Sequence, residues 1–275
     1  CKIMKVISPS SWSTTLLLDA MYYNAAKKNY KAAKAALKNI EKADKDFAKL
    51  RAKEKKVLDR HNGDSFSAYD KLEPIYIQME DAEYSIGAAY GPHLQHLALT
   101  HILCAAATEA HINQVAKKTL TGKFRDQFEK VSLEGKWLFL PRMTGRDCFD
   151  QGAEPFQSFS MLVKYRNELV HYNELVHYKG KKEKWESLEQ GRPKFLDKLG
   201  LSLPEALRSL QTVKMMILEL SKMTLNEPPY WLRKGYDKLP TDVGTNYFEI
   251  EIENPKESKP NKPLKEDASK NRRAS

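Results

Sequence analysis

Hydrophobic residues recur at intervals of three and four positions through most of the first 225 residues, which is the spacing of one helical face. Between residues 13 and 60 the remaining positions are rich in Ala, Lys and Glu, which are strong helix formers, and Gly and Pro are absent. This segment predicts one very long helix or two helices in series. Residues 61–65 (HNGDS) then predict a turn with a helix stop.

The same periodicity predicts further helices downstream, over residues 68–88, 92–119, 122–131, 155–170 and 203–223. Gly91-Pro92 is expected to open the second of these and Glu154-Pro155 the fourth, since Pro is favoured in a first helical turn. Residues 135–152 are aromatic and loop-like, so no helix is expected there. Together these elements predict an all-α helical bundle.

The pattern changes after residue 226. Residues 247–252 alternate between apolar and polar side chains like a short strand, whereas Pro, Lys, Glu, Ser and Asn dominate from Asn254 onward, as in a disordered tail. We therefore predict an N-terminal long helix or helical arm (1–66), a helical domain (67–226), a C-terminal extension (227–253) and a disordered basic tail (254–275). The N-terminal helix is expected either to dock on the domain or to project from it.

Charge and cysteine content narrow the function classes. The chain has 275 residues and a net charge of +10, which favours a polyanion such as RNA as partner. No apolar run approaches the roughly 20 residues that span a bilayer, and no signal peptide is evident, so we expect a cytoplasmic protein without a membrane partner. Cys1, Cys104 and Cys148 are far apart, which argues against a disulfide framework or a zinc site.

One predicted helix carries residues suited to phosphodiester chemistry. Arg166, Asn167 and His171 lie within two turns beside an apolar stripe. An imidazole can move the proton of a 2′-hydroxyl near neutral pH, and a guanidinium can neutralise the charge that builds on phosphorane oxygens. Five helical positions separate Arg166 from His171 by about 140° around the axis and about 7.5 Å along it. A second subunit or a break at the helix end would therefore have to complete the site.

These residues resemble a known motif. Arg166-Asn167-x-x-x-His171 is similar to the RX4–6H motif of the HEPN superfamily, including the polar residue that usually follows the Arg. Residues 148–159 (CFDQGAEPFQSF) resemble the segment that leads into the motif helix of bacterial HEPN-like proteins, and residues 108–113 (TEAHIN) resemble part of an earlier helix. The resemblance covers roughly residues 94–220.

The resemblance implies a HEPN-type bundle that forms a homodimer, in which two motifs build one cleft. It implies a metal-independent endoribonuclease that leaves 2′,3′-cyclic phosphate ends, acting as a toxin or phage-defence effector with RNA and an antitoxin or defence-system protein as partners. Arg166 would stabilise the phosphate, His171 would act in acid–base chemistry and Asn167 would orient the reacting group or the Arg. The alternative is a catalytically silent HEPN-like module that binds RNA, a nucleotide or a partner protein.

A tandem duplication complicates the motif, because the six residues NELVHY at 167–172 are repeated at 173–178. The second copy supplies His177 as an alternative histidine, but in a continuous helix it would lie about 16 Å along the axis from Arg166. The second copy is also preceded by Tyr172 rather than by an Arg. We therefore favour His171.

Other polar residues are assigned supporting or structural roles. Glu109 and Asn113 are four positions apart, on one helical face, and are expected to support the motif helix rather than take part in the chemistry. His93, His96 and His101 share a helix without acidic or Cys ligands at metal spacing, and His101 is expected to be a buried, hydrogen-bonded histidine. No metal site and no cofactor are predicted, and no nucleotide-binding Gly-rich loop is present.

Overall fold

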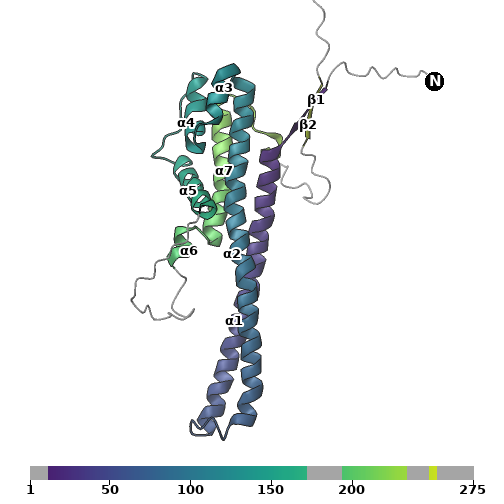
Figure 1. Cartoon of the computed structure of the whole chain (residues 1–275), viewed down its shortest axis with the longest axis vertical. Helices are drawn as coiled ribbons and strands as arrows, with labels where there is room; N and C mark the ends of the chain where they lie inside the picture. The colour runs from purple at the N-terminus through teal and green to yellow at the C-terminus, as the bar shows by residue number, and fades with distance from the viewer. Residues whose placement is uncertain (1–11, 172–193, 234–247, 253–275) are drawn as a thin grey trace, which may run out of the picture. The chain divides into compact units, whose positions relative to one another are not determined.

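The computed structural model describes residues 12–171, 194–233 and 248–252. These residues belong to two compact units, one within residues 18–245 and one that contains the strands at 12–16 and 248–252. The described part of the first unit is helical, which confirms the predicted all-α fold class (Figure 1). The tail at 254–275, predicted to be disordered, lies outside the described residues.

Two long helices form a hairpin that begins the first unit. α1 (Leu18–Arg60) is the single very long helix that the sequence allowed, and α2 (Tyr69–Thr119) returns alongside it (Figure 1). Asn62 and Gly63 adopt positive φ angles between the helices, where Gly is the residue with least strain. Although both helices exceed the length that spans a bilayer, no described helix is also apolar enough to cross a membrane.

The expectation of two helices separated at Gly91-Pro92 is wrong, because α2 continues through both residues. A proline inside a helix removes one hydrogen bond, here to the carbonyl of Ala88. Both Pro92 and Ala88 are exposed, so the ring has room and the carbonyl faces water. Meanwhile His93 and Leu97 are buried on the opposite side, and their packing holds the helix together across the proline.

The loop expected at residues 135–152 is wrong in its first part, where α4 (Leu133–Met143) forms. The Ser132 hydroxyl accepts a hydrogen bond from the backbone N–H of Gly135, which caps this helix, and Trp137 and Leu140 bury its inner face. The remaining helices of the bundle are α3 (Gly122–Glu129), α5 (Phe156–Val170), α6 (Lys194–Lys198), α7 (Leu203–Thr224) and the 3₁₀-helix η2 (Tyr230–Leu232).

The core of the bundle surrounds the second half of α2, which packs against α1, α3, α4, α5 and α7. Aromatic rings fill the space between α4 and α5: Trp137 contacts Phe159 with ring centroids 5.6 Å apart, and Phe159 contacts Phe156 at the same distance. The largest fully buried side chains include Leu97, Ile112, Trp137, Leu140, Phe159, Leu162, Met216 and Ile217. Burial of these side chains is the main term that stabilises the bundle.

The second unit contains a two-stranded antiparallel sheet. β1 (Trp12–Leu16) pairs with β2 (Phe248–Ile252), with Trp12 opposite Ile252 and Leu16 opposite Phe248. The alternation of side chains predicted a strand at residues 247–252, and β2 confirms it. Segments from the two ends of the chain are therefore joined by a backbone ladder.

Replacing a core aromatic should destabilise the bundle far more than replacing an exposed one. Phe159 is fully buried, so Phe159→Ala should lower the free energy of unfolding by about 3–5 kcal/mol. The matched control Tyr84→Ala removes a ring that is 78% exposed and should change stability by less than about 0.5 kcal/mol. Urea denaturation followed by circular dichroism measures both, and equal losses would contradict the assignment of the core.

Candidate functional site

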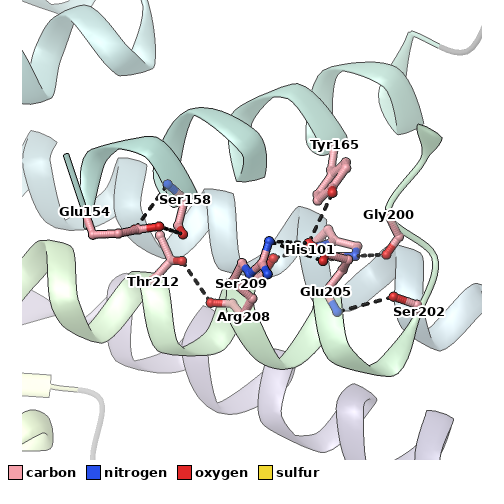
Figure 2. Close-up of polar contacts among 10 residues, drawn as sticks. All are labelled: His101, Glu154, Ser158, Tyr165, Gly200, Ser202, Glu205, Arg208, Ser209 and Thr212. Atoms are coloured by element: carbon pink, nitrogen blue, oxygen red, sulfur yellow. Dashed lines mark hydrogen bonds and ion pairs between the residues drawn. The ribbon is translucent and has the colours of Figure 1, made fainter. Parts of the chain in front are cut away.

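The motif residues belong to the last turns of α5, a helix with one buried and one exposed face. Phe156, Phe159 and Leu162 are buried at helical spacing and fix the inner face against neighbouring helices. At the start of the helix the Ser158 hydroxyl donates a hydrogen bond of 2.7 Å to Glu154, which satisfies polar groups of the first turn (Figure 2). The orientation of α5 therefore determines where its C-terminal end points.

Arg166 and Asn167 form a side-chain pair at that end. An Nη of Arg166 donates a hydrogen bond of 3.0 Å to Oδ1 of Asn167. Asn167 is exposed and Arg166 is half-buried. This contact limits the rotation of the guanidinium and leaves its other N–H groups available for a ligand. The roles of Arg166 and Asn167 in the chemistry stay predictions.

His171 lies where α5 ends. Its backbone N–H donates to the carbonyl of Asn167 at 2.9 Å, its φ and ψ of −108° and 24° depart from the helix, and its side chain is exposed. The described geometry contains no hydrogen bond between the side chains of Arg166 and His171. The two groups needed for phosphodiester chemistry are therefore both accessible but are not joined within one copy of the chain.

The second NELVHY block, including the alternative histidine His177, lies outside the described residues.

Glu109 is part-exposed on α2, where its carboxylate pairs with the buried ammonium group of Lys136 on α4, with Nζ and Oε1 3.7 Å apart. Oδ1 of Asn113 is buried without a hydrogen-bond partner among the described residues. The contact described for Glu109 thus connects α2 to α4 and does not reach Arg166 or His171.

Tyr165, which directly precedes the motif Arg, is a residue that the sequence motif does not identify. Its side chain lies on the buried side of the same helical turn. Its hydroxyl donates a hydrogen bond of 3.1 Å to Glu205 on α7, and its ring lies 5.1 Å from the ring of His101 (Figure 2). Gly200 lies against the ring so closely that an added Cβ would come within 2.7 Å of it. Burial and the nearby charge of Glu205 raise the pKa of Tyr165 to about 12, so the hydroxyl keeps its proton and can donate.

The predicted burial of His101 is confirmed, and both of its ring nitrogens have partners. Nε2 lies 2.8 Å from the carbonyl oxygen of Gly200, and Nδ1 lies 2.8 Å from the hydroxyl of Ser209 (Figure 2). Because a carbonyl can only accept, Nε2 carries the hydrogen, and the neutral ring accepts from Ser209 through Nδ1. Burial lowers the pKa of His101, which keeps the ring neutral.

A second buried cluster joins three distant segments. Oδ2 of Asp19 on α1 lies 2.9 Å from Nδ1 of His111 on α2 and accepts a hydrogen bond of 3.2 Å from Nε1 of Trp231 in η2. All three side chains are buried. Because the cluster is enclosed, it holds the start of α1 and the η2 segment on α2 and does not offer a reactive group to solvent.

Comparison of the chain with protein-family models, with curated proteins and with solved structures found no match. Within the described residues, no group of three or more His, Cys, Asp or Glu side chains is arranged to hold a metal ion. The candidate site is therefore defined by the chemistry and placement of Arg166, Asn167 and His171.

The lowered pKa of His101 should make stability depend on pH. Because the pKa of His101 is lower in the folded chain, the unfolded chain binds more proton at this histidine as pH drops below about 6.5, and the free energy of unfolding should fall there. His101→Gln, which removes the ionisable ring, should show a shallower fall between pH 7 and 5 in urea denaturation. His96→Gln, from a half-buried position on the same helix, is the control. Parallel curves for the parent and His101→Gln would contradict the linkage.

Proposed function

We propose that the chain is a metal-independent endoribonuclease of HEPN type. The observation that carries the proposal is the hydrogen-bonded pair of half-buried Arg166 and exposed Asn167 at the end of α5, with the exposed imidazole of His171 where the helix stops. A guanidinium held by an amide suits the recognition of a phosphate, and an imidazole suits proton transfer near neutral pH. No other described residue is required for the chemistry.

In the proposed reaction a ribose 2′-hydroxyl attacks the adjacent phosphorus while His171 removes its proton. Arg166 stabilises the negative charge that develops on the non-bridging oxygens, and Asn167 keeps the guanidinium in position. The 5′-oxygen leaves with a proton from water. The products are a 2′,3′-cyclic phosphate and a 5′-hydroxyl.

A homodimer would complete the site. Within one chain no hydrogen bond joins the side chains of Arg166 and His171, and a site formed by the ends of two α5 helices related by a two-fold axis would bring each Arg toward the histidine of the partner. Met161 and Val170 on α5 are 38% and 48% exposed, which leaves apolar surface beside the motif for such a contact. Uncontrolled RNA cleavage would arrest growth, so the proposal includes a toxin or phage-defence role with an inhibitory partner.

The cleavage proposal is tested with a mixed RNA pool in the presence of EDTA. The parent should cleave and leave 2′,3′-cyclic phosphate ends, because the nucleophile and both catalytic groups are independent of metal. Arg166→Ala and His171→Ala should each lose on the order of 10²-fold in rate. Lys164→Ala, which removes another exposed cation from α5, is the matched control and should keep full activity.

The choice between the duplicated blocks is tested in the same assay. His177→Ala should retain activity, and deletion of residues 173–178 should preserve or improve it. Loss of activity in His177→Ala with activity retained in His171→Ala would show that the second block supplies the histidine. If the parent and the deletion variant both bind RNA but do not cleave it, the nuclease proposal is wrong and the catalytically silent binding module is the better interpretation.

The dimer proposal is tested by complementation. Co-expressed Arg166→Ala and His171→Ala chains, purified as a mixed dimer through two different tags, keep one Arg and one His on opposite subunits. Cleavage should return in the mixed dimer although neither variant alone is active. An inactive mixed dimer, or a parent that cleaves as a monomer in light scattering at tens of micromolar, would contradict the composite site.

A further inference from the structure

Basic residues on α1 follow a strict repeat. The pattern Lys-x-x-Lys-x-x-x-Lys begins at Lys31, recurs eleven residues later at Lys42, and recurs again at Lys53, where Arg60 takes the last position. We call these nine positions the lysine stripe. An eleven-residue period corresponds to 3.67 residues per turn, which is close to the 3.6 of an α-helix, so the repeat returns to nearly the same face.

The helix places the whole stripe on one side. At about 100° per residue the nine positions fall within an arc of about 100°, and from first to last they extend about 43 Å along the axis. All nine side chains are exposed, whereas Ala33 and Leu50 on the inner side of α1 are buried. The result is a straight row with one cation for about every 5 Å of helix.

Few cations of the stripe are in direct ion pairs. Among the described residues, Lys49 is the one member with an ion-pair partner, Asp46, with Nζ and Oδ1 2.9 Å apart. Like charges three and four positions apart on a helix repel one another and destabilise it. Glu41, Asp46 and Asp59 on the same helix offset part of this repulsion, and a bound polyanion would offset more of it.

We propose that the lysine stripe binds the phosphate backbone of an RNA strand. The identity of the polyanion rests on the proposed function, whereas the surface itself rests on the repeat, the exposure and the small number of direct ion pairs. Ammonium groups in a row suit phosphates because they act as point charges and release condensed counterions without reading bases. Binding should therefore be independent of sequence and strongly dependent on salt.

A membrane surface fits the stripe less well. A helix that lies in a lipid interface inserts large apolar side chains beside its basic residues. The large hydrophobic side chains that are exposed in the described chain include none on α1, whose apolar side faces α2. The stripe thus offers charge without an inserting surface.

The stripe also lies on a different helix from the motif. α5 packs against α2, α4 and α7, and α1 packs against α2 and α7 (Figure 1). A substitution on the stripe can therefore change RNA binding without touching Arg166 or His171. The stripe would hold an RNA strand while the ends of α5 cut it.

The test measures binding of a labelled 30-nucleotide RNA in which every 2′-hydroxyl is methylated, so that the proposed cleavage cannot occur. Fluorescence anisotropy compares the parent with a variant in which Lys38, Lys42, Lys45 and Lys49 are changed to Gln. The control variant changes four exposed lysines outside α1, at positions 117, 123, 130 and 198, to Gln. Both variants lose four charges, and circular dichroism checks that both fold.

The stripe variant should bind at least about tenfold more weakly near 0.1 M salt, and the slope of log K against log salt should become shallower by about 2.8, or 0.7 for each lost contact with a single strand. The control should lose much less. Equal losses would show that only net charge matters and would overturn the proposal.

Two further outcomes would also overturn it. Unchanged RNA binding with lost binding to phosphatidylserine vesicles would assign the stripe to a membrane, and unchanged RNA binding with a lost dimer would assign it to a second copy of the chain. Failure of this proposal can be distinguished from failure of the nuclease proposal. If the parent does not cleave RNA but its RNA binding requires the stripe, only the nuclease proposal is contradicted. If the parent cleaves RNA and the stripe variant binds RNA normally, only the stripe proposal is contradicted.

Discussion

Hydrogen bonds from three buried histidines on α2 fix the positions of the helices around it. His93 bonds to the carbonyl of Ala33 on α1, His101 to Ser209 on α7, and His111 to Asp19 at the start of α1. Each ring is enclosed, so a shift of either neighbouring helix would leave a buried polar group without a partner, at a cost of about 1–3 kcal/mol. Apolar contacts alone would tolerate such a shift more easily, because they are not directional.

His101 also connects these hydrogen bonds to the candidate site. Its Nε2–H holds the carbonyl of Gly200, the residue whose missing side chain lets the Tyr165 ring lie against the backbone. Tyr165 in turn bonds to Glu205 on α7, so the last turns of α5 are tied to α2 and to α7 one residue before Arg166. The pair of half-buried Arg166 and exposed Asn167 therefore extends from a turn whose inner side is fixed.

Local features of this structure could be predicted from the sequence and long-range ones could not. Apolar periodicity predicts α1, α3, α5 and α7. It fails at Pro92, where packing outweighs one lost hydrogen bond. It also fails at α4, where aromatic residues form a helix instead of the expected loop. The bond between Asp19 and His111 joins positions 92 apart, and the bond between Tyr165 and Glu205 joins positions 40 apart. The sequence pattern of either segment alone contains no sign of such a partner.

The lysine stripe is visible in the sequence, but its period is carried by polar positions rather than apolar ones. This period can be compared with that of a seam between two helices. A seven-residue repeat drifts by about 20° per repeat on a straight helix and would turn by roughly 80° over thirty residues, as a seam with a neighbouring helix does. The eleven-residue repeat drifts by about 20° per repeat in the opposite sense, or roughly 55° over the same thirty residues. All nine of its side chains are exposed, so the row lies on the water side of α1 for its whole length and not against α2.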